Sequence, residues 1–163
     1  MNTNKTMLNK IKQFICRPVI IEKKWKQANL ALAIVGIFDT GYLTYAHYKT
    51  QILKCFGYTA VNGCHVVTES IYSTILGVPV AVIGLCFYTF VLTVAILSLK
   101  NKYNFLLNLL LPITALATLL SLRFIYLQVA VIGYICYYCM VSAALSIALF
   151  TISAIIYKRI NRI

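Results

Sequence analysis

Four long apolar runs organise the chain, and short polar or charged segments separate them. The runs cover Ala28–His47, Gly77–Leu99, Phe105–Leu127 and Ile132–Tyr157. Each has about the 20 residues that cross the hydrocarbon core of a bilayer as a helix. The pattern predicts an all-α integral membrane protein, a four-transmembrane-helix bundle with helices at about 28–48, 77–99, 105–127 and 132–157.

The composition agrees with a membrane protein. Of the 163 residues, 61% are hydrophobic, and the mean hydropathy is +0.85. The net charge of +12 could indicate nucleic-acid binding, but the basic residues lie at the two ends and in the gaps between apolar runs. Charges placed in this way report membrane topology, so we expect no nucleic-acid partner.

The basic residues fall mostly on one side of the predicted bundle. The segments 1–26, 100–104 and 158–163 together hold 12 of the 15 Lys and Arg residues. The positive-inside rule then predicts that both termini lie in the cytoplasm. We expect a multi-pass protein of the plasma (inner) membrane. We divide the chain into a basic cytoplasmic tail (1–26) on anionic lipid, a four-helix membrane domain (27–158) and a second cytoplasmic tail (159–163). A cleaved signal peptide is disfavoured, because the apolar run after the basic segment is too long.

An outward loop, residues 49–76, is longer than a bare helix connection and is typical of a functional segment. Its Asn62-Gly63 pair predicts a turn. Further on, Val66–Leu76 predicts a short amphipathic lid helix lying over the mouth of the bundle. The apolar positions of that helix are Val67, Ile71 and Ile75.

The six cysteines are divided by this topology. Cys55 and Cys64 lie on the outward loop, and Cys136 and Cys139 begin the last apolar run, so all four face the oxidising side. Cys16 is predicted to be a free cytoplasmic thiol. Cys86, within the second run, is assigned to packing.

Cys136 and Cys139 are three positions apart, so on a helix both sulfurs share a face and could form a disulfide or bind one ligand. A helix N-terminus also stabilises a thiolate. Two cysteine pairs in one compartment can exchange disulfides if the loop pair meets outside proteins and the other pair lies beside an electron acceptor. The chain has no flavin, haem or nucleotide motif, which leaves a quinone dissolved in the membrane as the natural acceptor.

Three segments together carry a family resemblance. They are Asp39–Tyr45 (DTGYLTY), Cys64–Ser70 (CHVVTES) followed by Leu76–Pro79 (LGVP), and Cys136–Ala143 (CYYCMVSA). In order and spacing they resemble the bacterial members of the vitamin K epoxide reductase family, over roughly residues 28–157.

The resemblance implies a quinone-dependent thiol oxidoreductase, with ubiquinone or menaquinone in the bundle, that re-oxidises a periplasmic thioredoxin-like protein and so drives disulfide formation. By position, Cys55 exchanges with the partner, Cys64 then exchanges with Cys136, and a Cys139 thiolate reduces the quinone. Ser70 matches a serine at the mouth of the family's site, where its hydroxyl could bond a quinone oxygen or a sulfur. Alternatively, Ser70 belongs only to the polar face of the lid helix.

Three features depart from the family's pattern. Many bacterial relatives continue into a thioredoxin-like domain, whereas this chain stops at Ile163, so we expect a separate partner. The interval from Cys55 to Cys64 is a little longer than the family's. Ala143 stands where animal members have a tyrosine, which makes reduction of vitamin K quinone or its epoxide the weaker enzymatic alternative.

Two further classes remain open. The chain could be a metal-binding membrane protein in which the four outer cysteines and His65 serve as soft ligands. The loop has no second Cys-x-x-Cys, however, which disfavours that interpretation. The third class is a structural bundle with incidental disulfides.

Polar residues within or near the runs are candidates for supporting roles. Asp39 and Arg123 differ in predicted depth by roughly 6 Å, so we expect an ion pair between them or separate contacts with the lid backbone. The alternative is that Arg123 only extends to the membrane surface. His47 and His65 could handle the two protons that quinone reduction consumes, or could simply be interfacial polar residues.

Overall fold

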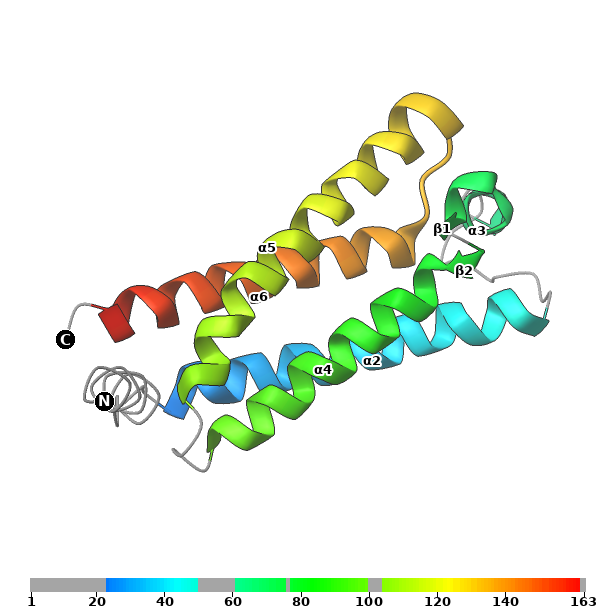
Figure 1. Ribbon diagram of the computed structural model, residues 1–163. Coiled ribbons are helices and arrows are strands. Elements are labelled where there is room, and N and C mark those ends of the chain that lie inside the picture. The colour runs from blue at the N-terminus through cyan, green and yellow to red at the C-terminus, as the bar shows by residue number, and fades with distance from the viewer. Residues whose placement is uncertain (1–22, 50–60, 76, 100–103, 162–163) are drawn as a thin grey trace, which may run out of the picture.

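A computed structural model describes residues 23–49, 61–75, 77–99 and 104–161. Its four long helices are α2 (Lys23–Lys49), α4 (Val80–Leu99), α5 (Asn104–Tyr126) and α6 (Tyr137–Asn161). At one end of the long helices lie a short helix, α3 (Val61–Glu69), and the strands β1 (Thr74–Ile75) and β2 (Val78–Pro79), as Figure 1 shows. The all-α class predicted from the apolar runs is confirmed.

The long helices pack through α2 and α6. Helix α2 lies along α4 and also contacts α6, and α6 contacts α5. Gly36 permits the close approach of α2 to α4, because a Cβ at this position would lie 2.3 Å from the ring of Tyr88. The main core is apolar and is drawn from all four helices; its buried members are Ala33, Tyr88, Val91, Val94, Leu107, Leu110, Leu149 and Ile156.

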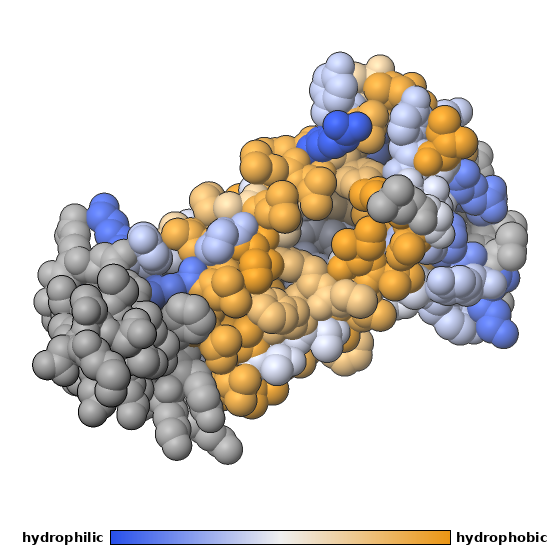
Figure 2. All heavy atoms as spheres, in the orientation of Figure 1, coloured by the Kyte–Doolittle hydropathy of each residue, from blue (hydrophilic) through white to orange (hydrophobic). Residues whose placement is uncertain are grey.

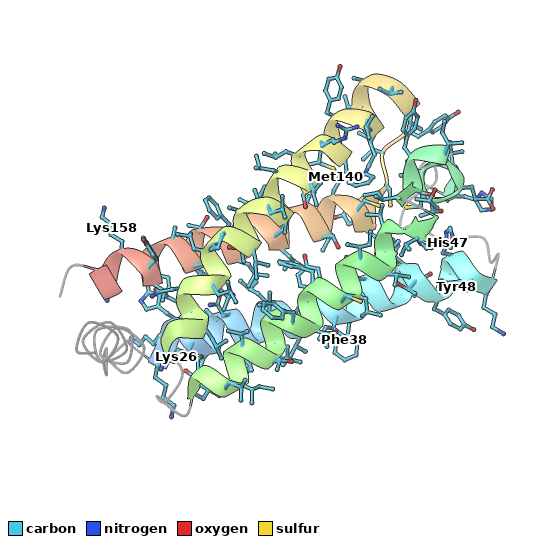
Figure 3. All side chains as sticks on the ribbon, viewed as in Figure 1. Lys26, Phe38, His47, Tyr48, Met140 and Lys158 are labelled. Atoms are coloured by element: carbon cyan, nitrogen blue, oxygen red, sulfur yellow. The ribbon has the colours of Figure 1, made fainter. Side chains whose placement is uncertain are left out.

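Contacts at the other end of the bundle fix the helix directions. The Nζ of Lys26 donates a hydrogen bond of 2.8 Å to the carbonyl of Ser98, and the Arg159 guanidinium lies 5.8 Å from the centre of the Trp25 ring. The start of α2 therefore meets the ends of α4 and α6. Figure 3 shows Lys26 and Lys158 at this end, with His47 and Tyr48 at the opposite end, where α3 lies.

Three of the described helical segments are long and apolar enough to cross a membrane: Val80–Leu99, Leu106–Ile132 and Tyr137–Arg159. Figure 2 shows a broad apolar surface over the middle of the face in view. The predicted first crossing, residues 28–48, corresponds to α2, which has sufficient length but carries Asp39, Thr40 and Thr44 in its second half. The four-crossing prediction is thus supported for three helices by length and composition.

The boundary between the third and fourth predicted helices is wrong. Instead of ending near residue 127, the helix continues as a π-helical segment, Leu127–Ile132, and stops at Gly133, whose φ of 72° is left-handed. Glycine takes this conformation without steric cost. Helix α6 therefore begins at Tyr137 and not at residue 132, which leaves Cys136 directly in front of its first turn.

The predicted lid helix at Val66–Leu76 is also misplaced. The helix in this region is α3, which includes the Asn62-Gly63 pair expected to form a turn. It ends at Glu69 because Ser70 is extended and its hydroxyl donates to the carbonyl of Val67 (2.8 Å). Beyond a 3-10 turn, Ile71–Ser73, the β-branched residues of Thr74–Ile75 pair with Val78–Pro79 in an antiparallel hairpin.

Candidate functional site

The site is built around the two cysteines that begin α6. The Sγ of Cys139 donates to the Sγ of Cys136 across 2.7 Å, and both are free cysteines. The backbone N–H of Cys139 also points at the Cys136 sulfur (3.4 Å), and the N–H of Met140 donates to the Cys136 carbonyl (3.1 Å). Cys136 therefore occupies the N-cap position, with its sulfur where a capping oxygen would normally accept.

The side chain of Gln128 fixes the backbone of Cys136 through a hydrogen bond. This glutamine is 1% exposed, and its Oε1 accepts a hydrogen bond of 3.0 Å from the backbone N–H of Cys136. The contact is possible because the chain reverses at Gly133, which returns Cys136 to the π-helical segment eight residues earlier. Gln128 was not predicted as a site residue; its only signal in the sequence is an amide in an otherwise apolar stretch.

The electrostatics of Cys136 favour a thiolate. The hydrogen bond from the Cys139 thiol is the largest influence and lowers the pKa of Cys136, and the backbone N–H groups of Cys139 and Tyr138 lower it further. Burial and the nearby Asp39 carboxylate act in the opposite direction without reversing the shift. A thiolate is the nucleophile of disulfide exchange, so Cys136 is prepared to attack another sulfur.

A third sulfur lies beside this pair. Cys64, on α3, is disulfide-bonded, and because Cys86, Cys136 and Cys139 are free, its partner lies outside the described residues. Cys64 and Cys136 are both 0% exposed and belong to one buried cluster, whose other members are Leu43, Ala46 and Val67. The structure thus brings together a loop cysteine, Cys64, and a helix cysteine, Cys136, that the sequence singled out.

Gly63 makes this approach possible. A Cβ at Gly63 would lie 2.8 Å from the carbonyl oxygen of Ile135, well inside ordinary contact. Only a glycine lets the backbone of α3 come so near to the residue that precedes Cys136. The glycine next to Cys64 therefore sets the spacing between the two cysteine-bearing segments.

A cavity of about 310 Å³ opens beside the dithiol. Cys139 and Ser70, the two residues predicted from the sequence to contact a quinone, both line it. Its wall is mostly apolar, and α4 and α5 contribute more residues to it than any other elements, including Ile83, Phe87 and Leu116. Figure 2 shows the apolar face hollowed near its middle. The volume is at the lower end of the ~300–1,000 Å³ typical of small-molecule sites.

Asp39 contacts α6 and not α5, the helix that carries the expected partner Arg123. The predicted ion pair with Arg123 is wrong: the hydroxyl of Ser142 donates to Oδ2 of Asp39, and Arg123 is exposed. Serine is a short donor on the face of α6 that meets α2, so it satisfies the carboxylate without a second buried charge. Tyr88 donates to the carbonyl of the same Ser142 across 2.9 Å.

The remaining candidates are scattered. His47 lines the cavity, whereas His65 contacts Glu69 within α3 (Nδ1 to Oε2, 3.2 Å). Cys86 is exposed on α4, so its assignment to internal packing is wrong. Cys16 and Cys55 lie outside the described residues. Within the described part of the chain, no three His, Cys, Asp or Glu side chains are grouped to hold a metal ion.

Apolar helices that can span a membrane, a thiolate-favouring Cys-x-x-Cys and an adjoining cavity together define a membrane thiol oxidoreductase. A comparison with known protein families is specific on this point, because the vitamin K epoxide reductase family matches residues 28–154. The chain belongs to that family, as the sequence resemblance indicated. Its members are membrane oxidoreductases that link thiol chemistry to quinones.

Proposed function

We propose that this protein is a quinone-dependent thiol oxidoreductase that re-oxidises a separate periplasmic thioredoxin-like protein and so drives disulfide formation. Electrons enter through Cys55 and Cys64, pass to Cys136 and Cys139, and leave on a quinone. The observation that carries the proposal is the position of Cys139: it contacts the Cys136 sulfur on one side and lines the cavity on the other.

The first transfers use the loop pair. We assign Cys55 as the disulfide partner of Cys64 and as the sulfur that the partner protein's thiolate attacks. Cys64, once released, exchanges with Cys136, beside which it is buried. The hydrogen bonds that lower the pKa of Cys136 make it a good leaving group in one direction and a good nucleophile in the other.

The residues around the cavity fit a quinone. A quinone is a flat apolar ring with two carbonyl oxygens, and the wall is apolar with a few hydroxyls, among them Ser70 and Ser142. When bound, the quinone accepts two electrons and two protons. Cys139 would supply the contact through which the dithiol gives up its electrons, and Ser70, whose hydroxyl donates to the Val67 carbonyl, would accept or border a polar atom of the ligand at the cavity wall.

The helix directions support a particular membrane arrangement. We propose that α2 is the fourth crossing, since it runs beside α4 from Lys26 near one end to Thr40, opposite Gly84, and beyond. Both termini then face the cytoplasm, and α3 faces the periplasm. Ile83, Leu116 and Leu120 are partly exposed and also line the cavity, so the quinone has a path from the lipid.

The test is quinone reduction by the purified protein with a reduced thioredoxin-like partner. We expect the wild type to turn over, Cys139→Ala to fail even with dithiothreitol as the donor, and Cys55→Ala to fail only with the protein partner. Cys86→Ala is the matched control, because this cysteine is exposed on α4 and should leave turnover unchanged.

Two results would overturn the proposal. One is a wild type that is inactive with ubiquinone and menaquinone alike but contains stoichiometric metal, which would make the cysteines ligands. The other is retention of partner oxidation in Cys139→Ala. Replacing the quinone with vitamin K epoxide in the same assay separates the alternative activity, for which we expect little turnover.

A further inference from the structure

Asp39 is a carboxyl group beside the dithiol that the electron path leaves without a role. It is half-buried on α2, and its Oδ2 accepts the hydroxyl hydrogen of Ser142. Ser142 lies one turn along α6 from Cys139, and both residues line the cavity. A hydroxyl that bonds a carboxyl on one side and borders a substrate cavity on the other is the geometry of a proton relay.

The surroundings of Asp39 contain no described cation that would fix its charge. The titratable groups that interact with it electrostatically are Tyr88 on α4 and, at the start of α6, Cys136, Tyr138 and Cys139. All of these are neutral or negative, so a negative Asp39 and a negative Cys136 oppose each other. One added proton removes the repulsion between the two negative charges, and the Asp39 carboxyl can hold that proton.

We propose that Asp39 stores a proton while the dithiol is reduced and returns it through the Ser142 hydroxyl to the cavity when the dithiol is oxidised. This inference rests on the proposed quinone reduction. The reduced site comprises a Cys136 thiolate, a Cys139 thiol and a protonated Asp39. As the Cys136–Cys139 disulfide forms, two electrons leave the sulfurs, one proton leaves Cys139 and one leaves Asp39. The quinone becomes a quinol, the site keeps the same net charge of minus one, and Asp39 is left as a carboxylate.

Asp39 acts through Ser142 and is therefore a positioning and proton-storing residue, whereas the Ser142 hydroxyl borders the reacting group. The relay gives a role to the contact between a serine and a carboxyl at the place where α2 meets α6. It also assigns to Ser142 a donor and an acceptor role at once, which a hydroxyl can fill by rotating about its C–O bond.

The first test needs no quinone. Difference infrared spectra of the purified protein, oxidised against reduced with dithiothreitol, should show a protonated carboxyl C=O band that grows on reduction. The band should vanish in Asp39→Asn and shift in frequency in Ser142→Ala, which removes the hydrogen bond. Ser153→Ala is the matched control, since this α6 serine is buried without a hydrogen bond to the described residues.

The second test is the rate of quinol formation. Asp39→Asn and Ser142→Ala should each slow it by about a hundredfold, Ser142→Thr should recover most of the rate, and Ser153→Ala should match the wild type. A wild-type rate in Asp39→Asn, or a carboxyl band that persists in it, overturns the relay. A wild type that forms no quinol overturns the proposed function instead, and the infrared band then still reports whether Asp39 takes up a proton.

Discussion

Gly63→Ala tests whether the spacing between α3 and the start of α6 controls the exchange between Cys64 and Cys136. The new Cβ would lie 2.8 Å from the Ile135 carbonyl oxygen, and ordinary contact begins at 3.4 Å, so the two segments must separate by about 0.6 Å. The atom met is backbone, which cannot rotate away as a side chain could. Cys64 follows Gly63 and Cys136 follows Ile135 in the chain, so separating Gly63 from Ile135 also moves the two cysteines apart.

Two effects on stability nearly offset each other. Alanine is favoured over glycine inside a helix by about 0.8–1 kcal/mol, whereas overpacking costs about 1–3 kcal/mol. The net loss of about 0–2 kcal/mol leaves the protein folded. The rate is more sensitive, because a misplacement of about 1 Å can cost roughly 100-fold. Scaled to the shift at Gly63, the exchange should slow by about 15-fold.

The assay isolates one exchange. In a Cys139→Ala background, the Cys64–Cys136 bridge cannot be resolved by the second helix thiol, so it accumulates and can be quantified by alkylation and mass spectrometry. Gly41→Ala is the control, because a Cβ at this α2 glycine would meet no other atom within 4 Å. Equal rates of bridge formation in the two variants would refute the argument that Gly63 sets the sulfur spacing.

Three further outcomes are expected. Gln128→Leu leaves the buried N–H of Cys136 without its acceptor and should lower the free energy of unfolding by about 1–3 kcal/mol, measured by denaturant titration. Removing the hydrogen-bond donor in Cys139→Ala should raise the pKa of Cys136, so that thiolate absorbance in the reduced protein disappears at a higher pH as the pH is lowered; Cys139→Ser should raise it less. Gly36→Ala forces a Cβ to 2.3 Å from the ring of Tyr88 and should destabilise the α2–α4 contact by about 1–3 kcal/mol or more, seen as a lower Tm.

Each of these outcomes has a matched comparison. Gln27→Leu changes an exposed glutamine of α2 and should leave the unfolding free energy within about 0.5 kcal/mol. A similar loss in that variant would contradict the role of Gln128. If Cys136 titrates at the same pH with and without the Cys139 thiol, then the hydrogen bond from Cys139 does not lower the pKa of Cys136. Equal Tm values for Gly36→Ala and Gly41→Ala would show that α4 can move away from α2 without a loss of stability.

The apolar runs and the cysteine spacing predicted the helical class and the pair at the start of α6, because both depend on local periodicity. Where the chain reverses was not predictable in the same way. The end of the third helix is decided by the left-handed Gly133. This is the only glycine in the sequence after Gly84, but hydropathy alone does not register a left-handed turn inside an apolar stretch. The lid helix was misplaced because Ser70 ends α3 through a hydrogen bond that hydrophobic periodicity does not register.

The partners of polar residues were equally hard to predict. Depth alone paired Asp39 with Arg123, but the choice between a distant arginine and a nearby serine depends on which helices are neighbours. Since α2 contacts α6, Ser142 reaches the carboxyl first. Gln128 was missed for the same reason: its role follows from a chain reversal that brings residues eight apart into hydrogen-bonding distance.

The complete burial of Cys64 and Cys136 restricts the order in which the proposed disulfide exchanges can occur. With no exposed surface, neither sulfur can be attacked by a thiol that diffuses in from solution. The order of the proposed exchanges is then enforced by access, since each sulfur can react only with the neighbour folded against it. A chain of this kind needs no steep gradient of redox potential between its two cysteine pairs. A partner protein must therefore enter through the loop pair, although a small thiol such as dithiothreitol can reach the partly exposed Cys139. The quinone at the end supplies the overall direction even where the two disulfides are nearly equal in energy.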